Sequence, residues 1–145
     1  MSENRIAAGV LPICLKTGRI CLVQRAKNQS HPESWASFGG SVENGEKIKE
    51  AAHREFREET LYFGSYKLSS SFIYKNKDGD LTFYTYLGIF DEEFEVDIEG
   101  ANEGMDYGWF ELCELPENII PGAKKMFESR KKYLQNIIEF YSKKH

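Results

Sequence analysis

A chain of 145 residues is long enough for one domain with its own hydrophobic core, and we expect residues 1–145 to form a single domain. Hydrophobic residues make up 41% and charged residues 29% of the chain, which excludes an intrinsically disordered protein. The net charge of −4 predicts no extended nucleic-acid-binding surface, because such a surface needs a strong excess of basic residues.

Periodicity and turn residues predict strands and helices in alternation along the chain. Strands alternate in hydrophobicity at every second residue, whereas amphipathic helices repeat every three to four residues. In chain order the predicted elements are strands over residues 6–15 and 20–24, a helix from residue 46 to about residue 60, strands over residues 67–74 and 81–90, an acidic loop over residues 91–108, a strand over residues 109–112 and a helix from residue 122 onward. This order predicts an α+β fold, with a mixed sheet held between helices.

Both predicted helices carry an apolar stripe. In the first, Ile48, Ala51, Ala52 and Phe56 recur at helical spacing and are expected to be buried. In the second, seven apolar residues share one broad face, which we expect to pack on the core rather than to bind a partner. These seven are Met126, Phe127, Tyr133, Leu134, Ile137, Ile138 and Tyr141.

The cysteines and the absence of targeting segments bear on the compartment. Cys14, Cys21 and Cys113 are too few and too scattered for a disulfide framework, and an odd number fits a reducing compartment. No stretch approaches the roughly 18 apolar residues of a membrane helix, and the first residues do not form a signal peptide. We therefore expect a cytoplasmic protein that makes no membrane contact.

Three glutamates of the first helix point to metal chemistry. Glu55, Glu58 and Glu59 stand at positions i, i+3 and i+4, so their side chains project from one face of the helix. Like charges at this spacing repel one another, and a divalent cation would offset that repulsion. Mg²⁺ and Mn²⁺ prefer carboxylate oxygens, so this face is a candidate metal site. A solvated helix face with salt bridges would have a similar composition.

The loop before the helix favours the metal site over the solvated face. Gly39 and Gly40 allow a backbone to approach a ligand closely, and the carbonyl of Gly40 can add a neutral oxygen ligand. Glu46 precedes Glu55 by nine residues, about two and a half turns of an ideal helix, and could serve a second metal or hold Arg54. Arg54 precedes Glu58 by four residues, which predicts a pair that orients this carboxylate.

Residues 40–62, GSVENGEKIKEAAHREFREETLY, resemble the signature of the Nudix hydrolases. That signature is a glycine, five residues, a glutamate, seven residues and then R-E-U-x-E-E-x-G-U, where U is a bulky apolar residue. Seven positions match in register: Gly40, Glu46, Arg54, Glu55, Phe56, Glu58 and Glu59. The resemblance implies a Nudix fold, which is an α/β/α sandwich around a mixed sheet, and a homodimer is compatible with it. It also implies hydrolysis of a nucleoside diphosphate linked to another group.

The resemblance also implies the roles of individual residues. The metal ion, Mg²⁺ or Mn²⁺, would be bound by the Gly40 carbonyl and by four glutamates, which are Glu46, Glu55, Glu58 and Glu59. The implied catalytic group consists of Glu55, Glu58, Arg54 and Glu103. The base that activates the attacking water would be a helix glutamate or a loop acid such as Glu103, with Glu99 and Asp106 as competitors.

The remaining candidates concern a small-molecule nucleotide substrate. Arg25 closes a predicted strand and could bind a phosphate, although a surface charge explains it nearly as well. Trp35 could stack on a base, with core packing as the alternative. His53, next to Arg54, is expected to pack or to be solvated rather than to act as a catalyst.

Two positions depart from the family pattern. Leu61 replaces the glycine that usually closes the helix, so we expect an altered helix exit with Gly64 as the new turn. Phe38 stands where many relatives have proline, which we expect to adjust only the loop. Because no expected metal-binding carboxylate is lost, an active enzyme is favoured over the alternative, a catalytically silent module that binds and senses a nucleotide. A calcium-binding structural domain is disfavoured because no EF-hand-like loop is present.

Overall fold

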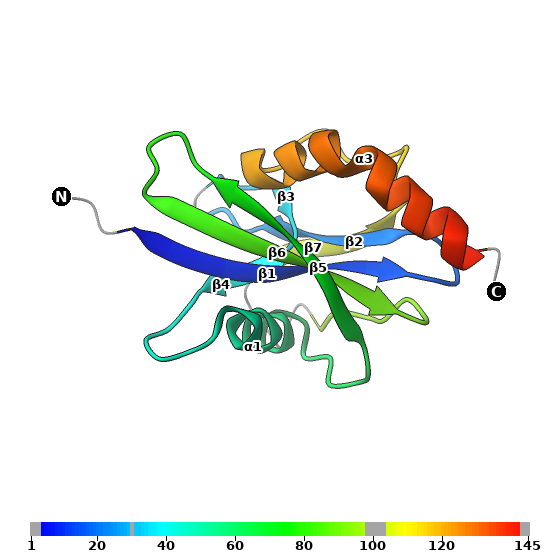
Figure 1. Ribbon diagram of the computed structural model, residues 1–145, viewed down its shortest axis with the longest axis horizontal. Helices are drawn as coiled ribbons and strands as arrows, with labels where there is room; N and C mark the ends of the chain where they lie inside the picture. Colours follow the sequence, from blue (N-terminus) through cyan, green and yellow to red (C-terminus); the bar gives the residue numbers. More distant parts are fainter. Residues whose placement is uncertain (1–3, 30, 98–103, 143–145) are drawn as a thin grey trace.

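The computed structural model describes residues 4–29, 31–97 and 104–142 (Figure 1). Its elements are β1 (Arg5–Cys14), β2 (Ile20–Arg25), β3 (Trp35–Ala36), β4 (Phe38–Ser41), α1 (Ile48–Thr60), β5 (Lys67–Lys75), β6 (Leu81–Phe90), β7 (Gly104–Phe110) and α3 (Pro121–Ser142). Within these residues, neither helix is both long and apolar enough to cross a membrane.

The strands form one mixed sheet of seven strands around β1. The order across the sheet is β3-β2-β1-β6-β5, while β4 pairs with β1 and β7 pairs with β2. β1 runs parallel to β6 along its whole length, from Arg5 opposite Leu81 to Cys14 opposite Phe90. The other strand pairs are antiparallel, including the predicted hairpin of β1 and β2. The expected mixed sheet is therefore confirmed.

The two helices cover opposite faces of this sheet (Figure 1). The alternation of β1 explains the three layers, because successive side chains of a strand point to opposite faces. Ala8 and Val10 belong to the buried cluster beneath α1, whereas Leu11 and Ile13 belong to the buried cluster beneath α3. The α/β/α sandwich expected from the resemblance is confirmed.

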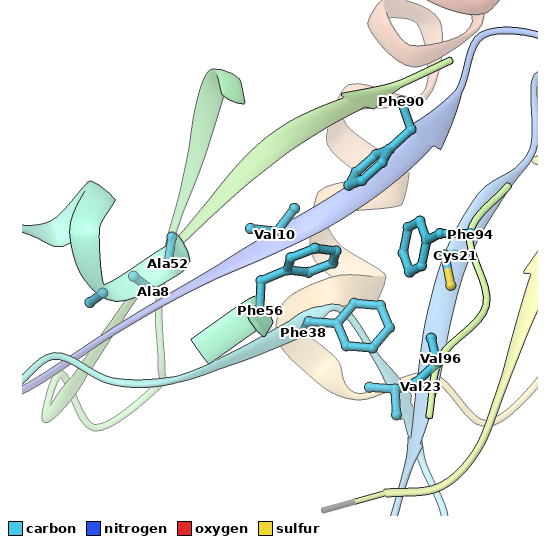
Figure 2. Packing of buried hydrophobic residues seen from close by; sticks show 11 residues of the cluster. Ala8, Val10, Cys21, Val23, Phe38, Ala52, Phe56, Phe90, Phe94 and Val96 are labelled. Atoms are coloured by element: carbon cyan, nitrogen blue, oxygen red, sulfur yellow. The ribbon is translucent and has the colours of Figure 1, made fainter. Parts of the chain in front are cut away.

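Aromatic packing fixes α1 against the sheet. Phe56 is fully buried, and its ring lies 5.5 Å from that of Phe38, 5.6 Å from that of Phe90 and 5.4 Å from that of Phe94 (Figure 2). Full burial of one such side chain contributes about 1.5–3 kcal/mol. Phe38 is itself fully buried at the start of β4, so the expectation that it adjusts only a loop is wrong. Phe38 helps to set the distance between α1 and β4, the strand that contains Gly39 and Gly40.

The strand predicted to follow the acidic loop begins earlier than expected. β7 begins at Gly104 rather than at residue 109, because it pairs with β2 as far as Arg25. Before it, Phe94 and Val96 are buried. The indole Nε1 of Trp109 donates a hydrogen bond of 3.1 Å to the carbonyl of Phe94, which ties this segment to β7.

The apolar stripe of α3 is only partly buried. Met126, Phe127 and Leu134 are buried against the sheet, which confirms that the stripe packs on the core. Tyr133 is 42% exposed, so its predicted burial is wrong. A helix turns by about 100° per residue, so Tyr133 falls beside the stripe when Leu134 lies on it. Its hydroxyl instead lies 2.9 Å from the hydroxyl of Ser70 in β5.

The end of α1 differs from the sequence-based expectation. Leu61 itself adopts the left-handed conformation, with φ 55° and ψ 27°, and its N–H donates to the carbonyl of Arg57. The helix therefore ends as it would with glycine at this position. Gly64 does not take over, because it is not among the described glycines with positive φ. A left-handed conformation costs a residue with a side chain about 1–2 kcal/mol.

Replacing Leu61 by glycine is expected to leave the protein more stable than replacing it by alanine. Both changes remove the side chain, but only glycine relieves the left-handed strain, and this relief exceeds the added backbone entropy of glycine by about 0.5–1 kcal/mol in the free energy of unfolding. For a chain of this size the melting temperature of Leu61→Gly should lie about 2–4 °C above that of Leu61→Ala, measured by thermal unfolding. Leu61→Ala is the control, since alanine keeps the strain and loses the side chain. If Leu61→Gly were no more stable than Leu61→Ala, the strain at this position would be negligible.

Candidate active site

Glu46 and Arg54 form a bidentate ion pair that connects the loop to the helix. α1 begins at Ile48, so Glu46 lies in the preceding loop and not two and a half helical turns before Glu55. The loop folds back, and Arg54 donates from Nε to Glu46 Oε2 at 2.7 Å and from Nη2 to Glu46 Oε1 at 3.1 Å. Of the two roles considered for Glu46, this geometry matches the one in which it holds Arg54.

Arg54 also gathers the glutamates of the helix face. Its Nη1 donates to Glu55 Oε1 at 3.0 Å and lies 3.3 Å from each carboxylate oxygen of Glu58. Its Nη2 donates to the backbone carbonyl of Ser41 at 2.9 Å. The predicted pair of Arg54 and Glu58 is therefore present, and the same nitrogen joins Glu55 to it.

The opposite charges of Arg54 and the glutamates stabilise one another's ionised forms. Hydrogen bonds from Arg54, together with one from the backbone of Glu43, lower the pKa of the Glu46 carboxyl. Hydrogen bonds to Glu46, and then those to Glu55 and Glu58, raise the pKa of the Arg54 guanidinium above its usual value. Arg54 thus stays charged and Glu46 stays ionised at neutral pH. The cluster keeps its shape as long as these charges persist.

Gly40 provides the space that Glu55 occupies. A Cβ added at Gly40 would lie 2.5 and 2.6 Å from the two carboxylate oxygens of Glu55, closer than non-bonded atoms approach. The Glu55 carboxylate therefore rests directly against the backbone of β4. Any larger residue at position 40 would displace it. Gly40 is required here for close packing, in addition to its predicted role as a carbonyl ligand.

Glu59 lies beneath the first glycine of the pair. Its Oε1 accepts a hydrogen bond of 2.7 Å from the backbone N–H of Gly39. Glu55 and Glu59 are one helical turn apart, and they contact adjacent residues of β4. The glutamate face of α1 and the strand β4 thus form one surface that presents carboxylate and backbone oxygens.

The donor set fits a divalent cation. The four predicted carboxylates, those of Glu46, Glu55, Glu58 and Glu59, lie in this cluster with the guanidinium of Arg54, so negative charge is in excess. Hard cations such as Mg²⁺ prefer oxygen ligands of this kind. In the described part of the chain, no three such side chains are already arranged around a common ion position. Glu55 and Glu58 converge on one nitrogen of Arg54, and both would have to turn from it toward a metal.

Two residues of this cluster were not anticipated from the sequence. The carbonyl of Ser41 accepts a hydrogen bond from Arg54, and Glu43 lies 3.7 Å from Arg54 Nη1. Ser41 acts through its backbone, so its residue type carries no signal. Glu43 could have been predicted from the sequence, because it precedes Glu46 by only three residues. In the structure its N–H donates to Glu46 Oε1 within the same short turn.

The candidates for binding the substrate lie on the neighbouring strands. Trp35, in β3, packs edge-on against Phe110 with ring centres 5.2 Å apart. Its backbone bonds to Asn118 and Ile120, so it supports the core beneath α3. Arg25 ends β2 opposite Gly104 of β7, at an irregularity in the pairing. The substrate roles of Trp35 and Arg25 stay predictions.

The candidates for the general base outside the helix follow β6 in the chain. Glu99 and Glu103 fall outside the described residues, so Glu103 stays a prediction from the sequence. Asp106 lies in β7 opposite Gln24, is exposed, and accepts a hydrogen bond of 2.8 Å from the backbone N–H of Tyr107. On the helix, His53 Nδ1 lies 2.6 Å from the hydroxyl of Tyr66, and burial lowers the pKa of this histidine. His53 therefore packs within the fold, as expected.

Comparisons with known proteins agree with this geometry. A family model described as the NUDIX domain matches residues 3–131. The nucleoside triphosphatase NudI of Salmonella paratyphi B is 33% identical, over 73% of this chain and 82% of that protein.

Solved structures share the fold. RenU, a Nudix hydrolase from M. smegmatis, superposes with a TM-score of 0.78 at 17% identity, covering 94% of this chain and 89% of that chain. A MutT NUDIX hydrolase from Burkholderia pseudomallei superposes with a TM-score of 0.66 at 21% identity, covering 86% of this chain and 95% of that chain.

Proposed function

This chain belongs to the Nudix hydrolase family and is a hydrolase of pyrophosphate bonds, and from that premise we propose that it hydrolyses a nucleoside diphosphate linked to another group with the help of Mg²⁺ or Mn²⁺. The observation that carries the proposal is the cluster of glutamates around Arg54 beneath Gly39 and Gly40. Nucleoside triphosphates are the first substrates to test, because the relative at 33% identity is named a nucleoside triphosphatase.

The cluster offers what the hydrolysis of a pyrophosphate needs. The substrate is anionic, so the carboxylates cannot bind it without a cation. A bound divalent ion supplies charge neutralisation and acidifies a coordinated water. Glu55, Glu58 and Glu59, with the Gly40 carbonyl, are the residues that we propose hold this ion. Glu46 would complete the set or act only by holding Arg54.

Arg54 has a positioning role in this proposal. Its guanidinium is tied to Glu46 and to the Ser41 carbonyl, so it is a fixed reference point for the helix face. From there it orients Glu55 and Glu58 through one nitrogen. We propose that Glu103 accepts the proton of the attacking water, with a helix glutamate, Glu99 and Asp106 as the alternatives that the sequence leaves open.

The test is turnover across a panel of nucleoside triphosphates, ADP-ribose, nucleotide sugars and dinucleoside polyphosphates. Released phosphate and pyrophosphate are measured after coupling to phosphatase or pyrophosphatase, with Mg²⁺ or Mn²⁺ and then with a chelator. We expect turnover that stops when the metal is removed. Folded protein that binds a nucleotide tightly but turns over no compound of the panel would instead support the catalytically silent module.

A further inference from the structure

The last turn of α1 carries Glu58 and Glu59 of the glutamate cluster. The helix ends at Thr60, one residue beyond Glu59. The carbonyls in the last turn of a helix have no partners within it, so this turn opens most easily unless other groups hold it. The position of the two carboxylates therefore depends on how the end of α1 is fixed.

The side chain of Thr60 holds this end from within the core. Thr60 is 1% exposed, although threonine is polar. Its hydroxyl donates a hydrogen bond of 2.7 Å to the carbonyl of Phe56 and accepts one of 3.1 Å from the N–H of Tyr62. A hydroxyl suits this place because it can donate and accept at the same time. One side-chain oxygen thus ties the chain that leaves the helix to the preceding helical turn.

The hydroxyl of Thr60 replaces a backbone contact that is common at helix ends. After a residue in the left-handed conformation, the next N–H often bonds back to a carbonyl of the last helical turn. Here Leu61 has that conformation, and its own N–H donates to the carbonyl of Arg57 at 2.8 Å. The next N–H, that of Tyr62, donates to the Thr60 hydroxyl instead. Valine at position 60 would remove the hydroxyl and both of its hydrogen bonds with little change of shape.

Backbone contacts on either side of Thr60 connect the end of α1 to the rest of the fold. The carbonyl of Thr60 accepts a hydrogen bond of 3.2 Å from the N–H of Asp97, in the segment after β6. The preceding residue, Glu59, accepts the hydrogen bond of 2.7 Å from the N–H of Gly39 in β4. Because Thr60 and Glu59 are consecutive, a shift of the Thr60 backbone moves the Glu59 carboxylate relative to Gly39.

We infer that Thr60 is a positioning residue, whose hydroxyl fixes the last turn of α1 so that the Glu59 carboxylate stays on the N–H of Gly39. The same hold keeps Glu58 and Glu59 in place for the metal ion, and in this respect the inference rests on the proposed function. Thr60 is buried, so it acts only through these two glutamates.

The experiment compares Thr60→Val, which loses the hydroxyl, with Thr60→Ser, which keeps it. The measurements are the hydrogen-exchange protection of the Gly39 amide by NMR and the affinity for Mn²⁺ by calorimetry. Thr60→Val should lose the Gly39 protection and bind Mn²⁺ about 10–100-fold more weakly, the usual loss when a group that orients a metal ligand is removed. Thr60→Ser should keep both properties.

Thr85→Val is the matched control. Thr85 is also a buried threonine, but it lies on β6 and lines a cavity with Met126 and Leu134 of α3. The substitution removes the same hydroxyl from the side of the sheet that α3 covers. It should leave the Gly39 protection and the Mn²⁺ affinity unchanged, whatever its effect on the melting temperature.

Each other outcome has a definite meaning. A lower melting temperature of Thr60→Val with unchanged Gly39 protection would overturn the inference, and so would equal losses in Thr60→Val and Thr85→Val. If the wild type bound no Mn²⁺ and hydrolysed no compound, the proposed function would fail, while the Gly39 amide would still decide the inference. If Thr60→Val did not fold, Thr60→Cys would replace it, because a thiol is a weak hydrogen-bond partner. Full Gly39 protection in that variant would count against the inference, and its loss would support it.

Discussion

Glu58→Gln should lower kcat by about 10²–10³-fold while leaving the fold intact. Glutamine has nearly the same shape but no charge, so it binds a divalent cation much more weakly. The concentration of Mg²⁺ that gives half-maximal turnover should rise in parallel. Glu58 is 49% exposed, and its ion pair with Arg54 contributes at most about 1 kcal/mol to stability. The measurements are steady-state kinetics over a range of Mg²⁺ concentrations and a thermal unfolding curve.

The control for this prediction is Glu128→Gln. Glu128 lies on α3, on the other side of the sheet from the glutamate cluster, and it is exposed. The substitution removes the same charge from the protein, so it corrects for any general effect of net charge. Turnover and metal dependence should match the wild type. Full activity in Glu58→Gln would contradict the proposal that this helix face holds the metal.

Gly40→Ala should lower kcat by about 100-fold with little loss of stability. The added Cβ overlaps the Glu55 carboxylate, which is the flexible end of a side chain and can swing away. The backbone pairing of β4 with Ala8 of β1 need not change. Once moved, Glu55 loses its place beside Arg54 Nη1. A displacement of about 1 Å in a positioned group is enough for a loss of this size.

Gly79→Ala is the matched control, with the opposite pattern of effects. Gly79 has a positive φ of 74° in the turn between β5 and β6, and a Cβ there meets no atom within 4 Å. Alanine should therefore lower the melting temperature by about 2–4 °C through backbone strain, with unchanged kcat. If Gly40→Ala instead lowered the melting temperature but kept the wild-type kcat, the role assigned to the Gly40 contact would be wrong.

The sequence predicted the elements that have strong local patterns. The apolar spacing of Ala51, Ala52 and Phe56 places all three in the buried face of α1, as observed. The turn around Gly79 joins β5 and β6 as predicted. These features depend on residues close to one another in the chain, which is why their patterns are readable.

Several details of the site could not be predicted in this way. The contact of Glu46 with Arg54 requires the loop to fold back, and helical spacing alone placed Glu46 elsewhere. Phe38 is buried because α1 packs over β4, which brings Phe56 to it. Leu61 keeps a strained conformation because its neighbours Thr60 and Tyr62 are held by the core. In each case a contact distant in the chain outweighs the local preference.

The sequence by itself determined the chemistry of this protein. The spacing of Glu55, Glu58 and Glu59 places three carboxylates on one helix face, whatever the helix packs against. Only the tertiary structure decided how that face is used: β4 brings Gly40 against Glu55, and the loop before α1 brings Glu46 against Arg54. The physical reason is that helical spacing follows from covalent geometry. The meeting of the helix with β4, by contrast, depends on the burial of apolar surface over the whole chain.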